Sequence, residues 1–545
     1  MPEYLSPGVY VEEIDTGNKP IEGVATSTAG FLGIAERGPT EATLVTSFSE
    51  YRRMFGSYVA NRYLTRGVEG FFQNGGKRCY VARVVSATAA AATAAAPGNV
   101  FTLTALGPGD WANGRLAFKI SDAGLGAQDA NLFKLTLMYW DVAPPAPVLD
   151  PTDSANATQQ TRRDPTILEM YDNLSFDAQS TSFYERRINN VSVLAEIRRN
   201  TAVPPARPAN LIGPSAGAGA GVTVAANQFL AAGTNGAALV PNDFLGDLTI
   251  PGNPGPPPVP ARPGHGLRGL EEVDEIAILC SPDEFAVGGV TGSLIEQCER
   301  LKDRFAILQS TDAPGAISTI LPPVTSKYGA FYFPWIRVFD FATGLPMLVP
   351  PAGHVAGIYA RSDIERGVHK APANEVIRGL FLDPQDPSSG LSIQVSKEQQ
   401  DILNPRGVNV LRYFRGRGNL VWGARTTTTD PDWKYVNVRR LFIYVEESIE
   451  EATQWVVFEP NDEPLWARVR RSVSDFLTRL WMDGMLQGRS KEEAYFVRCD
   501  RTTMTQADID NGKLIMLIGI APVKPAEFVI FRIGQWTGGS DVSEG

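Results

Sequence analysis

NPRGVNVLRYFRGRGNLVWGARTTTTDPDWKYVNVRRLFIYVEESIEEATQWVVFEPNDEPLWARVRRSVSDFLTRLWMDGMLQG, from Asn404 to Gly488, is the stretch that decides the fold. It begins with Val408–Phe414, which is rich in β-branched and aromatic residues, and continues with the shorter apolar run Leu420–Trp422; both are predicted to be strands. Apolar residues then recur at spacings of three and four over 438–456 and again over 464–488, which predicts two helices. The second helix has a proline in its first turn and is expected to end at Gly488.

The chain upstream of this stretch alternates between strand-like and helical patterns. Residues 21–86 and 265–400 both show this alternation, which predicts one α/β body on a largely parallel sheet. Within the body, Tyr328–Val338 is expected to be one continuous strand. Residues 99–264 mix strand-like runs with Pro/Gly/Ala-rich segments, which predicts a β-rich insertion that faces outward and is dispensable for assembly. The low-complexity run 87–98 is interpreted as a linker into the insertion.

The two ends of the chain, residues 1–20 and 525–545, are predicted to be arms. The second arm follows a C-terminal domain at 401–524. Residues 1–20 contain helix-breaking prolines around a strand-like run, and an isolated strand must pair with something, in this subunit or another. Residues 525–545 begin with an apolar run that also suits a strand. An open sheet edge would accept such strands by β-augmentation. The residues expected to make these contacts are Val9, Tyr10, Val11, Phe528, Ile530 and Phe531.

Composition bounds the class of protein. The 545 residues carry a formal charge of -10, which argues against general affinity for nucleic acid. The four cysteines include no C-x-x-C pair, so neither a zinc site nor a disulfide framework is indicated. The N-terminus does not have the pattern of a secretory signal, and no apolar run has the length of a membrane span.

Catalytic motifs are not apparent in the sequence. The three histidines have no motif around them, and Gly213–Gly217 matches the nucleophile elbow only by letter, because it lies in a Gly/Ala-rich loop. The sequence therefore predicts that the chain is not an enzyme and has no catalytic, cofactor-binding or metal-binding residue. The alternative is a hydrolase built on the α/β body, which would require a nucleophile with a placed base.

Positive charge is concentrated in residues 401–440, where eight Lys/Arg face three Asp for a local charge of +5. Three interpretations remain open: a basic face that is solvated or paired within the chain, a protein partner of opposite charge, and nucleic acid. The basic residues are Arg406, Arg412, Arg415, Arg417, Arg425, Lys434, Arg439 and Arg440.

The chain resembles contractile tail sheath proteins in several sequence blocks. The C-terminal blocks are VWGART (421–426), NVRRL (437–441), FEPND (458–462), FLTRLWMDGMLQG (476–488), EEAYFVRCD (492–500) and PAEFVIFRI (525–533). Further likeness lies in SPGVYVEE (6–13), in SFSEYRRMFG and GGKRCYVARV, and in 349–374. The resemblance covers about 1–86 and 265–538, and it is weakest in the insertion.

This resemblance implies a multidomain sheath fold with exchanged terminal β-arms. It also implies a subunit that stacks as rings around an inner tube and contracts to drive that tube through a target envelope. Its expected partners are other copies of the chain, the inner tube protein, and baseplate and terminator or cap proteins, with neither direct nucleic-acid binding nor membrane insertion. The expected contacts with the inner tube are Arg468, Arg471 and Arg479, on the helix face opposite its apolar stripe.

The implied location follows from the same resemblance. The chain would be made in a bacterial cytoplasm and become part of a phage tail or a released injection particle. A static filament or shell protein remains an alternative, and two cylinder lengths would distinguish a contractile sheath from it. The resemblance is equally compatible with a phage tail, a headless bacteriocin, an extracellular injection particle and a secretion system.

Overall fold

The computed structural model describes residues 20–126, 129–216, 221–249, 263–312, 315–530 and 532. The chain divides into two compact units. The larger comprises Gly23–Val368 and Pro372–Glu450, and the smaller comprises His369–Ala371 and the residues from Glu451 on, with those before Gly23. The first half of the quoted stretch thus belongs to the larger unit, which differs from the C-terminal domain expected to begin at residue 401.

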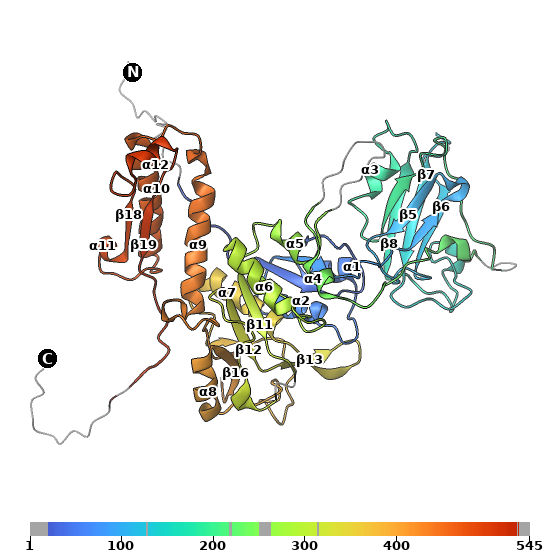
Figure 1. The fold of residues 1–545 in the computed structure, drawn as a ribbon. Helices are drawn as coiled ribbons and strands as arrows, with labels where there is room; N and C mark the ends of the chain where they lie inside the picture. Colours follow the sequence, from blue (N-terminus) through green and yellow to red (C-terminus); the bar gives the residue numbers. More distant parts are fainter. Residues whose placement is uncertain are drawn as a thin grey trace, which may run out of the picture. The chain divides into compact units, whose positions relative to one another are not determined.

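A nine-stranded sheet forms the centre of the larger unit, in the order β15-β17-β16-β12-β11-β10-β1-β3-β2 (Figure 1). The pairs from β16 through β12, β11, β10 and β1 to β3 are parallel, whereas β2, β17 and β15 pair antiparallel at the two sides. β1, β11 and β12 are buried along their whole length, as a parallel sheet covered on both faces requires. The bounds are β1 Ala29–Gly33, β2 Thr43–Val45, β3 Cys79–Arg83, β10 Ile278–Cys280, β11 Phe305–Gln309, β12 Gly329–Phe333, β15 Glu375–Val376, β16 Val408–Phe414 and β17 Gly418–Val421.

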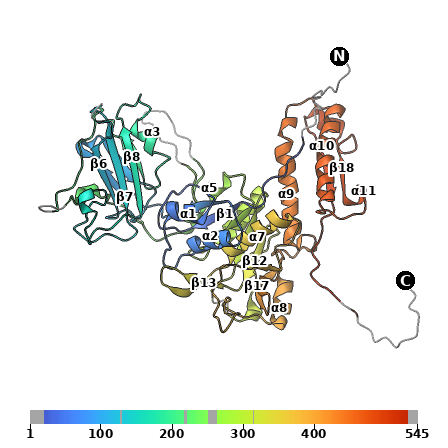
Figure 2. The same cartoon turned by 180° about the vertical axis from the view of Figure 1, so that it is seen from behind.

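Two groups of helices cover this sheet. In one group, α2 and α7 lie side by side (Figures 1 and 2) and approach closely at glycines. A Cβ added at Gly353 of α7 would lie 2.3 Å from the carbonyl oxygen of Gly67 of α2, so this contact requires glycine. In the other group, α4, α5 and α6 pack together. The bounds are α1 Phe48–Phe55, α2 Leu64–Gln73, α4 Pro241–Leu245, α5 Gly266–Glu271, α6 Val290–Leu301, α7 Ala352–Arg366, α8 Lys397–Leu403 and α9 Val436–Ala452.

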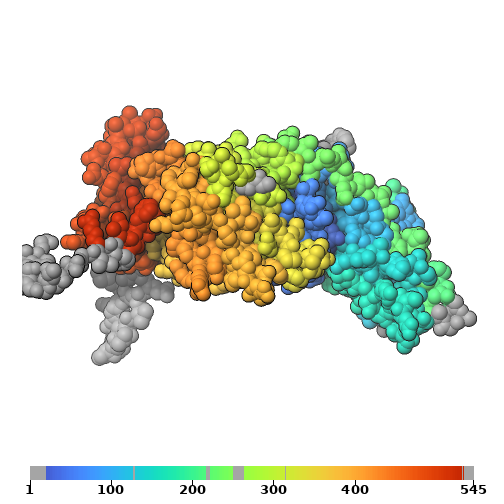
Figure 3. Space-filling model, turned by 90° about the horizontal axis from the view of Figure 1, so that it is seen from below, coloured from blue at the N-terminus to red at the C-terminus, as the bar shows by residue number. Residues whose placement is uncertain are grey.

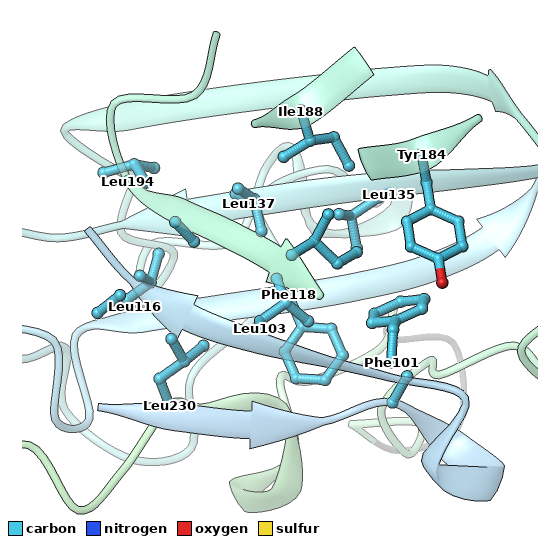
Figure 4. Close-up of a cluster of buried hydrophobic side chains, with 14 of the residues drawn as sticks. Phe101, Leu103, Leu116, Phe118, Leu135, Leu137, Tyr184, Ile188, Leu194 and Leu230 are labelled. Atoms are coloured by element: carbon cyan, nitrogen blue, oxygen red, sulfur yellow. The ribbon is translucent and has the colours of Figure 1, made fainter. Parts of the chain in front are cut away.

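Between β3 and α4 the chain forms a β-sandwich insertion with its own hydrophobic core. One sheet has the order β4-β5-β9 and the other β6-β7-β8. Figure 4 shows Phe101 and Leu103 of the first sheet facing Leu135 and Leu137 of the second, and all four are fully buried. The bounds are β4 Thr93–Ala95, β5 Phe101–Ala105, β6 Leu116–Asp122, β7 Phe133–Tyr139, β8 Ile167–Leu174, α3 Tyr184–Ile188 and β9 Ala195–Arg199. Because β4 lies inside 87–98, the run expected to be a linker is partly a strand of the insertion.

The insertion is attached to the body by buried polar contacts. The guanidinium of Arg37 lies 4.9 Å from the ring centre of Tyr139 in β7, and its Nη1 donates to the carbonyl oxygen of Arg53 at 2.7 Å. The two ends of the insertion also meet, because the amide of Ala87 donates to Oδ1 of Asp243 at 2.9 Å. The insertion forms a continuous surface of its own, in cyan and green in Figure 3.

The strand expected at Tyr328–Val338 is two strands in the structure. β12 ends at Phe333 within the central sheet, and β13 (Ile336–Asp340) pairs instead with β14 (Leu345–Val349) in a separate hairpin. Pro334 lies between them, and because proline has no amide hydrogen it interrupts the ladder. The prediction of one continuous strand was therefore wrong.

The smaller unit pairs a long helix with a two-stranded antiparallel sheet. α10 begins where Asp462 accepts from the amide of Leu465, as a helix cap does. It ends at Met482 rather than Gly488, because Gly484 adopts a positive φ of 76° and donates back to the carbonyl oxygen of Trp481 at 3.0 Å. The bounds are α10 Glu463–Met482, α11 Lys491–Ala494, β18 Tyr495–Arg498, α12 Gln506–Asp510 and β19 Leu517–Ile520.

Candidate assembly surfaces

The carboxyl edge of the parallel strands is where open α/β sheets usually bind ligands. Here the carboxylate of Asp283, just after β10, accepts from the amides of Ile34 and Tyr63 at 2.9 and 2.7 Å. After the neighbouring strands β11 and β12, the indole of Trp335 donates to the carbonyl oxygen of Ser310 at 2.6 Å. The amides of Ile34 and Tyr63, which could hold an anion, are thus already bound to Asp283.

A second buried carboxyl lies next to Asp283. Glu284 is 2% exposed; its Oε1 accepts from the amide of Gln309 at 3.2 Å, and its Oε2 lies 3.4 Å from the hydroxyl of Thr291. Burial raises the pKa of Glu284 to about 8. The group is therefore largely protonated at neutral pH and serves as an internal hydrogen-bond partner.

The histidines are not arranged for catalysis. His354 is buried in α7 against α2, where a Cβ added at Gly70 would lie 2.2 Å from its ring. Burial lowers the pKa of His354 to about 4, so its imidazole is neutral at neutral pH. His265 precedes α5, and His369 belongs to the smaller unit. Across the described ranges, no group of three or more His, Cys, Asp or Glu is placed to hold a metal ion.

Two cations of the basic stretch 401–440 are buried and form ion pairs within the chain. Arg440 is 3% exposed and forms a bidentate ion pair with Asp363 of α7, at 2.7 and 2.9 Å. Arg439 is 2% exposed; its guanidinium lies 4.6 Å from the ring centre of Trp433 and pairs with Glu446. These contacts support the interpretation of an internally paired face for these two cations, because groups so buried cannot meet a partner.

The three arginines expected to contact an inner tube lie on the exposed face of α10. Arg468 is half-exposed and lies 3.6 Å from Glu459, and Arg471 is exposed. Arg479 is exposed as well, but it donates to the carbonyl oxygen of Ile21 and so also fixes the described start of the chain. The opposite face of α10 carries the expected apolar stripe, which is buried: Trp466, Val469, Val473, Phe476 and Leu480. No helix of the described ranges combines the length and the apolar character that a membrane crossing requires.

The β18–β19 sheet has two open edges in the described part of the chain. The two strands pair only with each other, from Tyr495 with Ile520 to Arg498 with Leu517. The hydroxyl of Tyr495 contacts that of Thr478 at 2.7 Å, so one face of the sheet packs on α10. A two-stranded sheet is marginal alone, and its free edges can accept further strands.

The C-terminal segment leaves this sheet as an exposed chain. The carbonyl oxygen of Ala521 accepts from the amide of Gln487 at 2.8 Å, and no strand is formed from there to residue 530. Phe528 and Ile530 are 71% and 79% exposed. The other residues predicted to make arm contacts, Val9, Tyr10, Val11 and Phe531, lie outside the described residues.

One exposed apolar residue was not singled out from the sequence. Phe458, in the loop before α10, is fully exposed and has a positive φ of 69°. Its motif was visible in the sequence, but neither its exposure nor its backbone conformation can be deduced from residue types. Asp283 was missed for the same reason, because its role depends on amides distant in sequence.

Comparisons with known proteins agree with an assembly subunit. Residues 271–427 match the family model of the phage tail sheath protein central domain, and residues 428–535 match that of the phage tail sheath C-terminal domain. The two models together cover residues 271–535, and this part of the chain belongs to the tail sheath protein family.

Individual relatives are distant in sequence. A putative prophage major tail sheath protein of Pseudomonas aeruginosa is 24% identical over 48% of this chain and 65% of the relative. The tail sheath protein of Burkholderia phage BcepMu is 29% identical over 33% of this chain and 38% of the relative, and that of Enterobacteria phage T4 is 24% identical over 49% and 38%. The chain thus matches less than two thirds of the length of each of these relatives.

Solved structures resemble the chain over nearly its whole length. The helical sheath of the anti-feeding prophage in its contracted state is 26% identical, with a TM-score of 0.54, covering 98% of this chain and 99% of that one. The sheath of an extracellular contractile injection system in its contracted state has a TM-score of 0.54 at 21% identity and shows the fold alone. Both family models describe sheath protein domains and the anti-feeding prophage structure is a sheath, so these matches give no support to a hydrolase.

Proposed function

We propose that this chain is the structural subunit of a contractile sheath, which polymerises as stacked rings around an inner tube and contracts to drive that tube through a target envelope. The open β18–β19 sheet carries the proposal, because it leaves strand edges for other copies of the chain. The purified chain is expected to form hollow cylinders in negative-stain microscopy, in a long narrow and a short wide form. Cylinders of a single invariant length and width would favour a static filament.

Strand exchange through the terminal arms is the proposed link between copies. The apolar exposure of Phe528 and Ile530 supports it, because three consecutive exposed apolar residues, with Val529 between them, call for a partner. Each hydrogen bond of a ladder contributes only about 1 kcal/mol net, but several act together. Val9 and Val11 would supply part of the matching N-terminal strand.

Proline substitutions test this link. Val9→Pro with Val11→Pro removes ladder donors and should give a folded monomer that does not polymerise, as should deletion of residues 1–15. Val9→Thr with Val11→Thr is the matched control, because it keeps both amides and β-branched side chains. Sedimentation measures assembly and circular dichroism measures folding. Cylinders from the proline variant, or an unfolded monomer, would refute the arm as the link.

The exposed face of α10 is the proposed contact with an inner tube protein. Arg471 is the best residue for a test, because Arg468 already has Glu459 as a neighbour and Arg479 also binds Ile21. Arg471→Glu should weaken loading onto an acidic tube, more so at low salt, where charge steering is strongest. Arg489→Glu is the control, an exposed charge change in the same unit outside α10. Equal loading of both variants at every salt concentration would exclude this helix.

We further propose that the insertion faces outward and is dispensable for assembly. Its separate core supports this, and the contact between Ala87 and Asp243 shows where a short linker can close the gap. Replacing residues 88–239 with a short Gly/Ser linker spares α4, which the expected range 99–264 would have removed. Arg37 should be kept in this variant, because it loses the ring of Tyr139 but still donates to the carbonyl oxygens of Arg53 and Met54. A folded variant that forms no cylinders would contradict the proposal.

The proposed partners and location follow from the same assembly. Other copies of the chain, an inner tube protein, a baseplate and terminator or cap proteins would surround each subunit, with no direct role for nucleic acid. The chain would be made in a bacterial cytoplasm and become part of a phage tail or a released injection particle. Isolating such particles and identifying the chain by mass spectrometry tests both statements together.

A further inference from the structure

Phe458 combines full exposure with an unusual backbone conformation. Its relative exposure is 103%, and the neighbouring Val457 is 65% exposed. Its φ of 69° lies in the left-handed region, which is costly for a bulky aromatic residue. An aromatic side chain placed wholly in water at such a cost gains nothing within the isolated chain, so it requires another explanation.

The other residues with a positive φ in the described ranges show how unusual this is. Leaving out glycines, five of them are asparagines, which tolerate this region well. The remaining two besides Phe458 are Ala232 and Lys302, and Lys302 caps the end of α6. Phe458 is the only aromatic residue in this set.

The backbone on both sides of Phe458 is fixed by hydrogen bonds. The amide of Val457 donates to the carbonyl oxygen of Gln454 at 3.2 Å, and the amide of Glu459 donates to that of Val456 at 3.1 Å. Downstream, the side chain of Asn461 donates to the carbonyl oxygen of Lys513 at 3.0 Å. The backbone that carries the exposed ring is therefore fixed by hydrogen bonds on both sides.

We propose that Phe458, with Val457, is an apolar anchor that inserts into a second copy of this chain. This inference rests on the proposed function, in which every subunit is surrounded by other copies. Preorganised, fully exposed aromatic residues are the typical centres of protein interfaces. The conformational cost is then offset in the assembly, where the ring is buried.

The chemistry of the anchor favours another copy over the inner tube. The exposed face of α10, proposed to contact the tube, carries charged side chains such as Arg471. Phe458 and Val457 instead offer only apolar surface, which suits a contact that persists while the assembly reshapes. Their loop is also tied to the chain before β19, because the side chain of Asn461 donates to the carbonyl oxygen of Lys513.

Two glycine substitutions separate anchoring from folding. Phe458→Gly removes the ring and relieves the left-handed conformation, so its melting temperature should equal or exceed that of the wild type. The same variant should need at least about tenfold more protein to assemble, as expected for an interface centre. Lys302→Gly is the matched control, since it relieves a similar φ of 68° without removing apolar surface, and should assemble normally. Phe458→Asn, a second residue suited to this conformation, should behave like Phe458→Gly.

The outcomes are distinct. Assembly of both Phe458 variants at the wild-type concentration would overturn the anchor while leaving the proposed function intact, whereas a wild-type chain that never forms cylinders would overturn both. Placing the photo-cross-linker benzoyl-phenylalanine at position 458 in assembled particles identifies the partner. A product of twice the chain mass supports a second copy. A product with a tube protein, or one within a single chain, would overturn the proposal.

Discussion

Glu284 should make the larger unit lose stability as the pH rises. Its carboxyl is buried, and its pKa is raised from an ordinary value of 4.5 to about 8. In the unfolded chain the group releases its proton near pH 4.5, whereas in the folded chain it keeps the proton up to about pH 8. The free energy of unfolding therefore falls as the pH rises through this range, and it levels off above it.

The size of the effect depends on the pH window, because His354 titrates in the opposite sense. Its pKa is lowered from 6.5 to about 4 by burial, so its contribution to stability increases with pH between these values and offsets that of Glu284. Above pH 6.5 the histidine no longer contributes. Between pH 6.5 and 8, the titration of Glu284 should then lower the free energy of unfolding by about 2 kcal/mol, at about 1.4 kcal/mol per pH unit.

Glu284→Gln tests this reasoning. The amide side chain keeps an acceptor for the amide of Gln309 and cannot ionise, so the variant should lose the decline between pH 6.5 and 8. The assay is urea denaturation at several pH values, followed by a fluorescent reporter on the larger unit, at a protein concentration below that of assembly. Glu398→Gln is the control, because the pKa of this exposed carboxyl is lowered by the hydroxyl of Ser396 and it stays ionised throughout. Parallel curves for the wild type and Glu284→Gln would refute the account.

Two further predictions concern packing in the larger unit. Gly353→Ala should destabilise it by about 1–3 kcal/mol, because the added methyl group would meet the carbonyl oxygen of Gly67; a denaturation curve unchanged from the wild type would contradict the close contact of α2 and α7. Arg440→Met should lower the free energy of unfolding by about 3–5 kcal/mol, because it leaves the buried carboxylate of Asp363 without its guanidinium partner. Arg300→Met, in a half-exposed ion pair, should lower it by at most about 1 kcal/mol. Equal losses in thermal denaturation would show that burial of the ion pair does not matter here.

Local patterns predicted elements well where the chain's own residues set the structure. The β-branched and aromatic run Val408–Phe414 is β16, with the bounds that the sequence suggested. The helix at 464–488 was right in its start and its apolar face, but its end was assigned to Gly488 instead of the turn at Gly484. Two glycines in one short segment are both plausible stops, and hydrogen bonding decides between them.

Long-range pairing could not be read from the sequence. β16 joins the body because it pairs with β12, and the paired residues Phe331 and Val408 are 77 positions apart in the chain. A similar limit applies to charge, because a count of basic residues does not show that Arg440 is buried against Asp363. Both relations are between residues far apart in sequence, so composition and periodicity carry no trace of them.

The two units differ in how many of their polar and apolar groups have partners within the chain. In the larger unit, backbone amides at the carboxyl edge are bound by Asp283, and cations such as Arg440 are buried in ion pairs. In the smaller unit, both edges of the β18–β19 sheet are unpaired among the described residues, and Phe458 is fully exposed. A subunit that must hold its neighbours through a large rearrangement needs a body that does not change and a surface that is complete only in the polymer. Under the proposed function the smaller unit would supply that surface, so substitutions there should impair assembly before they impair folding.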